Sequence, residues 1–232
     1  MKILFFDMEF ADGKVPGSIY SFGYTVTDGE FRILTPPTDL LIHPESTWNE
    51  YVEKNILAYP KEEVEAAPNF AAHYPMLCDL FASCDLAVGF ALNNDLRALR
   101  KDCARYDLPP IPVRSFDTER LCRMLEEHKD AHGLGGYVKA WCGEEPDHRH
   151  RSDGDAYATM LLFRAICRAK HVTPEMLLIA FPECTGEGKE RKAKEKKPSG
   201  QRARSHSRRR KRKPSAKAAE KGSTAGNAPA AE

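Results

Sequence analysis

The sequence lacks a cysteine-pairing pattern, a long apolar run and an internal repeat. Its seven cysteines are odd in number, and no two of them form a Cys-x2-Cys pair. This spacing argues against a disulfide framework and against a structural zinc site. The apolar run before Asp7 is too short for a signal peptide, and no later stretch approaches the length of a membrane-spanning helix. We therefore expect a protein of a reducing, cytoplasmic compartment.

The formal net charge is only +1, but the charges are unevenly distributed. Residues 186–232 hold 16 Lys and Arg against 5 Asp and Glu, which leaves residues 1–185 near −10. The basic segment has almost no apolar side chains, so it cannot bury enough surface to offset the entropy of ordering the chain. We expect one folded domain over residues 1–182 and a disordered Lys/Arg-rich tail over residues 183–232.

The tail has three interpretations. Its charge attracts polyphosphate and releases counterions from it, so the tail would contact the nucleic-acid backbone and deliver single strands to an acidic domain. The run at residues 208–213, Arg-Arg-Arg-Lys-Arg-Lys, would be a nuclear-targeting patch if the source is eukaryotic. A solvated and dispensable tail is the third interpretation.

Two carboxylates stand at the end of the first apolar run. Residues 2–7 are typical of a buried central strand, and side chains at i and i+2 of a strand share a face, so Asp7 and Glu9 point the same way. Adjacent carboxylates in such a place need a cation or a proton. Oxygen-only ligands favour magnesium or manganese over zinc. A strand that ends in a polar loop, with both acids solvated, explains the pair equally well.

A third carboxylate lies where a strand is followed by a helix. Residues 85–91 predict a short buried strand, and residues 94–106 predict an amphipathic helix, so Asp95 stands near the helix start. An Asp there either caps the helix by accepting a backbone N–H or serves as a metal ligand.

A histidine-rich loop precedes the last predicted long helix. Asp155 falls in the first turn of that helix, and His150 lies in the loop before it. A histidine with a pKa near neutrality can take a proton from water and release it again. His148 and Asp153 repeat the same separation, but Asp153 followed by Gly154 fits the helix start better. The alternative is a solvated loop before an Asp-capped helix.

The order Asp7-x-Glu9, Asp95 and His150-x4-Asp155 resembles the DEDDh branch of the DnaQ-like, RNase T-like 3′-5′ exonucleases, within the ribonuclease H-like superfamily. The resemblance covers about residues 1 to 180. Supporting segments are residues 19–26, 67–70, 133–137 and 155–159. Each motif alone is nonspecific, and the resemblance depends on all of them occurring in this order.

The resemblance implies phosphodiester hydrolysis with two Mg²⁺ or Mn²⁺ ions. Asp7 would bridge the ions, and Glu9 and Asp155 would hold the ion that carries the attacking water. Asp95 would support the second ion, and His150 would be the general base. Independently, two ions about 4 Å apart can stabilise both the attacking and the leaving oxygen of an in-line displacement. The product would be a nucleoside 5′-monophosphate.

Two places depart from the family pattern and concern substrate contacts. Phe10 follows the motif glutamate where a small polar residue is common, and we expect Phe10 and Met8 to stack on or wedge against the last base. Phe90 and Ala91 stand where the family often has His-Asn, and Asn94 is the residue that we expect to contact the substrate in their place.

The predicted fold class is α/β, a ribonuclease H-like mixed β-sheet flanked by helices on both faces. In such open sheets, ligands bind at the carboxyl ends of strands, where Asp7 and Glu9 are placed. The predicted strands are residues 2–7, 18–27, 30–34, 85–90 and 113–116. The predicted helical segments are residues 46–82, 95–106, 118–127, 135–142, 154–170 and 174–180.

These observations predict a metal-dependent 3′-5′ exonuclease acting on the ends of single-stranded RNA or DNA. One alternative is a nucleic-acid-binding module of the same fold without turnover, in which the basic tail is the working part. Another is a hydrolase limited to very short oligonucleotides. The preference for RNA or DNA depends on contacts to the 2′-hydroxyl, which spacing alone does not place.

Overall fold

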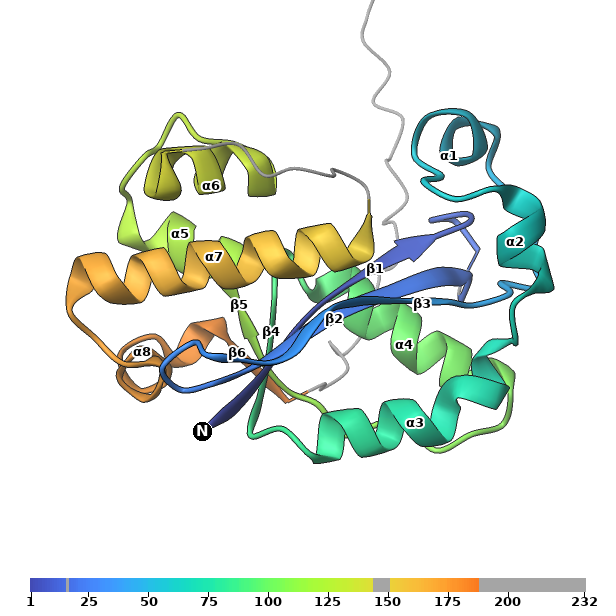
Figure 1. Ribbon diagram of the computed structural model, residues 1–232, viewed down its shortest axis with the longest axis horizontal. Helices are drawn as coiled ribbons and strands as arrows, with labels where there is room; N and C mark the ends of the chain where they lie inside the picture. Colours follow the sequence, from blue (N-terminus) through green and yellow to red (C-terminus); the bar gives the residue numbers. More distant parts are fainter. Residues whose placement is uncertain (16, 144–150, 188–232) are drawn as a thin grey trace, which may run out of the picture. The chain divides into compact units, whose positions relative to one another are not determined.

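A mixed six-stranded sheet forms the centre of the fold (Figure 1). The computed structural model describes residues 1–15, 17–143 and 151–187. The strands, in spatial order, are β3 (Ile33–Leu41), β2 (Ile19–Asp28), β1 (Lys2–Phe10), β4 (Leu86–Gly89), β5 (Arg114–Asp117) and β6 (Thr185–Glu187). β1, β4 and β5 are parallel to one another, whereas β2, β3 and β6 pair antiparallel with their neighbours. The predicted α/β class, with its mixed sheet, is confirmed.

Helices cover both faces of this sheet, as Figure 1 shows. The helices are α1 (Glu50–Asn55), α2 (Lys61–Ala66), α3 (Phe70–Ala82), α4 (Asn93–Arg105), α5 (Thr118–Leu125), α6 (Gly133–Cys142), α7 (Ser152–Lys170) and α8 (Pro174–Ala180), with a 3-10 turn, η1 (Pro182–Cys184). The core beneath α7 also includes residues of α5, α6 and α8, and the opposite core includes residues of α3 and α4. Among the described residues, no helix combines the length and apolar character needed to cross a membrane.

β1 is buried on both faces, and its alternation decides where its acids point. Ile3 and Phe5 belong to the core beneath α7, whereas Leu4 and Phe6 belong to the core beneath α3 and α4. All four side chains are fully buried, which accounts for the uninterrupted apolar run in the sequence. Asp7 continues the α7-facing series of side chains and therefore lies under the start of α7.

The third strand differs from the prediction in both position and length. We expected it at residues 30–34, but β3 continues to Leu41 and contains Pro36 and Pro37. The prolines lie between the paired residues Thr35 and Thr38, where the register with β2 shifts. Proline cannot donate to a neighbouring strand, but it is tolerated on an edge strand and at a bulge. The predicted helical segment 46–82 likewise divides into α1, α2 and α3.

The predicted domain boundary after residue 182 is too early. Residues 183–187 complete η1 and form β6, which pairs antiparallel with β5 from Phe116↔Thr185 to Arg114↔Glu187. Such a short strand has no apolar alternation to predict it from the sequence. The rest of the predicted tail, residues 188–232, lies outside the described residues.

Candidate active site

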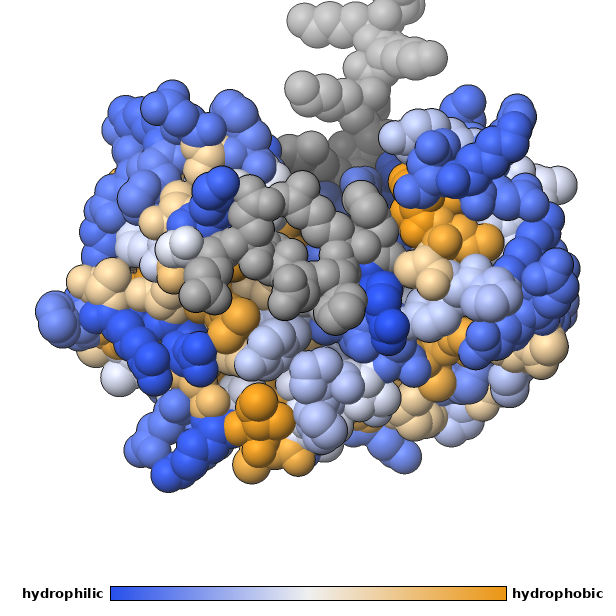
Figure 2. Space-filling model, turned by 45° about the horizontal axis from the view of Figure 1, so that its top comes forward, coloured by the Kyte–Doolittle hydropathy of each residue, from blue (hydrophilic) through white to orange (hydrophobic). Residues whose placement is uncertain are grey.

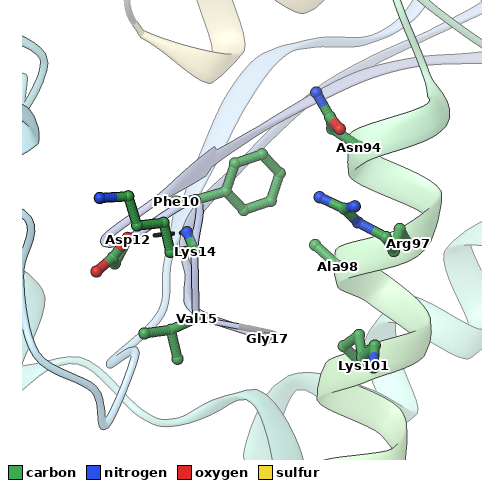
Figure 3. Close-up of a pocket in the computed structure, with 10 residues that line it drawn as sticks. Phe10, Asp12, Lys14, Val15, Gly17, Asn94, Arg97, Ala98 and Lys101 are labelled. Carbon is green, nitrogen blue, oxygen red and sulfur yellow. Dashed lines mark hydrogen bonds between the residues drawn. The ribbon is translucent and has the colours of Figure 1, made fainter. Parts of the chain in front are cut away.

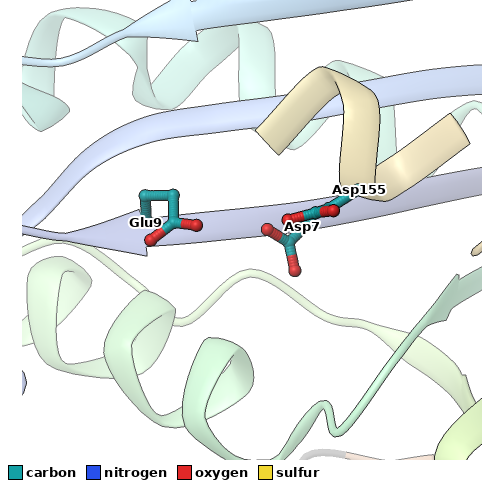
Figure 4. A group of neighbouring side chains, drawn as sticks. All are labelled: Asp7, Glu9 and Asp155. Carbon is teal, nitrogen blue, oxygen red and sulfur yellow. The ribbon is translucent and has the colours of Figure 1, made fainter. Parts of the chain in front are cut away.

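Three carboxylates from two elements meet at the end of the central strand. Asp7 and Glu9 project from β1, and Asp155 projects from the first turn of α7 (Figure 4). One carboxylate oxygen from each residue lies within 4.8 Å of the others. We call these three residues the acidic trio. Their spacing allows one cation to contact all three carboxylates, and oxygen donors of this kind suit Mg²⁺ or Mn²⁺.

Gly23 allows α7 to approach the sheet closely enough to bring Asp155 to β1. Gly23 pairs with Asp7 across β1 and β2. A Cβ atom at Gly23 would lie 1.9 Å from the carbonyl carbon of Ser152 and 2.0 Å from the backbone nitrogen of Asp153. Since these are backbone atoms at the start of α7, any side chain at Gly23 would push the helix away from the sheet.

The surroundings of the trio disfavour negative charge in the absence of a cation. Desolvation raises the pKa of Asp7 well above its ordinary value, and the charges of Asp95, Glu9 and Asp155 raise it further. Desolvation, followed by the charges of Asp155 and Asp95, raises the pKa of Glu9 to about 8. Among the described residues, neither Asp7 nor Glu9 forms an ion pair with Lys, Arg or His. A bound cation would reverse this electrostatic penalty.

Asp95 lies beside the trio on the helix that follows β4. It is the third residue of α4, and the N-cap position is occupied by Leu92, so the capping interpretation of Asp95 is wrong. Its side chain is buried, and desolvation together with the charge of Asp117 raises its pKa to about 7. Asp95 is also the largest source of negative charge acting on Asp7.

Asp117, which is not among the predicted site residues, holds the loop that leads to Asp95. It ends β5, and its carboxylate accepts hydrogen bonds from the backbone N–H of Ala91 and of Arg120, each at 3.2 Å. Ala91 has a φ of +59°, in the left-handed region that a residue with a Cβ seldom adopts. The hydrogen bond from Ala91 therefore stabilises the backbone bend that directs α4, and with it Asp95, toward β1.

A hydrogen-bond network on the other side of the trio joins the start of α7 to β2 and β3. The Ser21 hydroxyl contacts the Ser152 hydroxyl and lies 2.5 Å from an Asp39 oxygen, to which it donates. The Tyr59 hydroxyl donates to the other Asp39 oxygen. Desolvation is the main cause that raises the pKa of Asp39. Asp39 is not among the predicted site residues because the predicted third strand ended at residue 34. The tolerance of an edge strand for proline is the signal that could have extended that strand to Asp39.

Arg151 and Asp153 form a pair next to the trio. The Arg151 guanidinium lies 5.2 Å from the centre of the Tyr59 ring, and its Nε and Nη2 donate to Asp153 at 3.1 and 3.2 Å. Asp153 is thus engaged with Arg151, whereas Asp155 is the residue that reaches the trio. Of the two spacings that the sequence left open, this geometry favours the one that contains Asp155.

The other predicted site residues do not belong to the acidic trio. His150 and its alternative His148 lie outside the described residues. Met8 is only 3% exposed and packs in the core beneath α3 and α4, so the prediction that it stacks on a base is wrong. Phe10 and Asn94 both line an open pocket beside the site. The alternation of β1 could have indicated the burial of Met8, because Met8 shares a face with Leu4 and Phe6.

The fold resembles those of several solved structures. No family model matches the sequence, and no curated protein matches it. Solved structures do match, and they show that the chain has the ribonuclease H-like fold of the DEDDh 3′-exonucleases.

Three of these structures illustrate the similarity. A full-length 3′-exonuclease superposes with a TM-score of 0.59 at 13% identity, with 73% of this chain covering 61% of that chain. The nuclease domain of 3′hExo, a DEDDh family member bound to rAMP, gives 0.59 at 13% identity over 72% of this chain and 92% of that one. The zinc-bound form of an E. coli ExoI–ssDNA complex gives a TM-score of 0.61 at 20% identity, over 73% of this chain and 41% of that one. The chain thus spans less than two thirds of the first and third of these.

Proposed function

We propose that the protein is a metal-dependent 3′-5′ exonuclease that hydrolyses single-stranded RNA or DNA from the 3′ end. The observation that carries the proposal is the acidic trio with Asp95 beside it, at the carboxyl end of the central strand of this fold. The nucleotide and single-stranded DNA bound in two similar structures support a nucleic-acid substrate.

The residues of the site fit divalent ions. The trio offers oxygen donors only, and its raised carboxylate pKa values indicate negative charge without a compensating cation. The Tyr20 hydroxyl is buried without a hydrogen-bond partner among the described residues, and Glu9 is the largest charge that acts on it. Such an unsatisfied donor beside Glu9 is consistent with a site that is completed by a ligand.

We infer that Asp7, Glu9 and Asp155 hold one ion and that Asp7 and Asp95 support a second. Bound there, Mg²⁺ or Mn²⁺ would polarise the scissile phosphate and lower the pKa of water. In this scheme Asp7 would serve both ion positions, and the hydrogen bond from Ala91 to Asp117 supports the loop that places Asp95.

His150 would act as the general base. It precedes α7 by two residues in the sequence and Asp155 by five, so it is close to that ligand along the chain. The imidazole would take a proton from the attacking water, the new P–O bond would form in line with the P–O3′ bond that breaks, and the departing 3′-oxygen would gain a proton. The product is a nucleoside 5′-monophosphate.

A direct test follows the products of labelled strands. Single-stranded RNA and DNA, labelled at either end, are incubated with Mg²⁺, Mn²⁺ or EDTA and with wild type, Asp7→Asn, Asp155→Asn or His150→Ala. We expect metal-dependent release of mononucleotides from the 3′ end by wild type, and a loss of at least about 10²-fold in each variant. Asp153→Asn is the matched control from the same helical turn, and it should retain most of the activity.

Other outcomes would overturn the proposal or the roles that it gives to single residues. If wild type binds strands but releases nothing with any metal, the protein is a binding module of this fold. If Asp153→Asn is inactive and Asp155→Asn is active, the assignment of the ligands and the base is wrong. Hydrolysis of dinucleotides but not of longer strands would instead indicate a hydrolase of very short oligonucleotides.

A further inference from the structure

A pocket of about 440 Å³ lies between the β1–β2 loop and α4 (Figure 3). Phe10, at the end of β1, forms one wall, and Asn94 and Arg97 extend toward it from α4. Lys101 follows one turn further along the same helix face, and Lys14 lies on the loop. None of these basic residues has a place in the predicted site.

The pocket adjoins the acidic site through the chain itself. Phe10 directly follows Glu9, and Asn94 directly precedes Asp95. The two elements that carry site carboxylates therefore continue as the two walls of the pocket.

The charge of the pocket is opposite to that of the site. Arg97 and Lys101 form no ion pair with any described residue, and they stand on a domain whose net charge is near −10. Asp12 also lines the pocket, but its carboxylate accepts the Lys14 backbone N–H at 2.8 Å. Unpaired cations beside an acidic cluster suit a ligand with several negative charges in a row.

We propose that this pocket binds the backbone phosphate upstream of the scissile bond, with Arg97 and Lys101 as its contacts. The inference rests on the proposed exonuclease function. Contacts to phosphate position a strand without reading its sequence, so the pocket would set affinity and register and leave base preference unchanged. Phe10 would offer its ring to the adjacent base, and such stacking is tolerant of sequence.

The test uses the full chain with Arg97→Gln/Lys101→Gln. Its matched control is Arg100→Gln/Arg114→Gln, which also removes two charges but from residues that line a different pocket, beside Phe81 and Val113. Hydrolysis is measured on a single-stranded pentanucleotide and on the p-nitrophenyl ester of thymidine 5′-monophosphate, which has no upstream phosphate. We expect KM for the pentanucleotide to rise roughly tenfold or more with kcat little changed, and the effect on the ester to be clearly smaller.

A binding measurement separates this inference from the proposed function. In an Asp7→Asn background, which removes turnover, the affinity for the pentanucleotide is measured against salt concentration. Because both side chains contact a single phosphate, their loss should reduce the slope of log K against log salt by roughly 0.7. Arg97→Lys/Lys101→Arg retains both charges and should restore most of the affinity, which would not happen if the glutamines acted by disturbing α4.

The outcomes are distinct. If wild type hydrolyses both substrates but the glutamine variant matches its control in KM and salt slope, the phosphate site is wrong and the exonuclease proposal stands. If the glutamine variant raised KM equally for the pentanucleotide and for the ester, the assignment of the upstream phosphate to this pocket would also be wrong. If wild type hydrolyses neither substrate, the function fails, and a salt slope unaffected by the glutamine variant would then overturn the phosphate site as well.

Discussion

At the scale of single residues, the site depends on a few carboxylates and on one position that tolerates no side chain. Asp7, Glu9 and Asp95 are recognisable as polar residues placed next to apolar segments of the sequence. Gly23 is not recognisable in this way, because nothing near it in the sequence shows that the backbone of residues 152 and 153 will press against it.

Gly23→Ala should weaken both folding and catalysis. The added Cβ would overlap the backbone of Ser152 and Asp153, and overpacking of this kind typically costs about 1–3 kcal/mol. Because the start of α7 must move, Asp155 should leave the trio and metal-dependent hydrolysis should fall more than stability alone explains. Thermal unfolding and kcat of Gly23→Ala are compared with Gly29→Ala, whose new Cβ would make only ordinary contacts, the nearest at 3.7 Å. Unchanged kcat in Gly23→Ala would contradict the packing argument.

The carboxylates of the site should make the metal-free protein less stable as pH rises. Glu9 has a pKa near 8 in the folded protein against an ordinary value of 4.5, and that of Asp95 is near 7. The folded state therefore holds more protons than the unfolded state, so stability declines between about pH 4.5 and pH 8. A divalent cation competes with those protons, so it should raise Tm more at pH 8.5 than at pH 5.5.

The measurement is thermal unfolding in EDTA and in Mg²⁺ across this pH range. Glu9→Gln serves as the comparison because it removes the titrating group while keeping the shape of the side chain. Glu9→Gln should reduce the pH dependence of Tm in EDTA, and it should remove much of the stabilisation by Mg²⁺. A metal effect on Tm that is independent of pH in wild type would show that the carboxylates do not bind the ion.

At the scale of elements, the start of α7 is the part that must be placed accurately. Ser21 on β2 joins Asp39 on β3 to Ser152 at the first residue of α7. Tyr59, between α1 and α2, donates to the same Asp39 carboxylate. A chain of hydrogen bonds therefore runs from Tyr59 through Asp39 and Ser21 to the helix that carries Asp155.

Ser21→Ala should loosen this junction. It removes a buried hydroxyl that bonds to both Asp39 and Ser152, and leaving such partners unsatisfied costs about 1–3 kcal/mol. We expect a lower Tm and a weaker affinity for Mg²⁺, measured by calorimetry. The control is Ser83→Ala, since the Ser83 hydroxyl donates to the Leu80 carbonyl on an exposed part of α3. A reduced Tm with unchanged metal affinity would show that the network supports folding without positioning Asp155.

At the scale of the whole molecule, the chain divides by charge. Residues 1–187 hold 19 Lys and Arg against 30 Asp and Glu, so almost half of the positive charge belongs to the remaining 45 residues. Hydrophilic residues also dominate the face of the molecule in Figure 2, where hydrophobic residues form small separate groups. An acidic domain repels nucleic acid at long range, and a basic segment on the same chain would offset this repulsion.

Truncation after Glu187 should separate the contribution of residues 188–232 from that of residues 1–187, while β6 stays paired with β5. We expect the truncated protein to lose affinity for long single strands, with a smaller salt dependence, because phosphate contacts and the counterions they release are lost. Its hydrolysis of a dinucleotide should remain close to that of wild type. Binding is measured by fluorescence anisotropy on a length series of strands, and equal affinity for a 30-nucleotide strand with and without residues 188–232 would show a dispensable tail.

The sequence alone was sufficient for the α/β class, for the central strand and for the order of the acids. These features depend on neighbours along the chain: β1 is an uninterrupted apolar run, and α4 and α7 begin beside their acidic residues. The predictions for Met8 and for the third strand were wrong, although local rules could have given the right answer. Strand alternation puts Met8 on the buried face, and an edge strand tolerates the prolines of β3.

Only the tertiary structure decided which of these groups meet. Ser21 and Ser152 are 131 positions apart, and Gly23 faces the same distant backbone, so no periodicity in the sequence indicates either contact. The pairing of Arg151 with Asp153, the support of Ala91 by Asp117 and the pocket of Arg97 and Lys101 likewise depend on how helices pack on the sheet. Propensity and alternation act over a few residues, whereas close packing brings together side chains whose separation along the chain carries no signal.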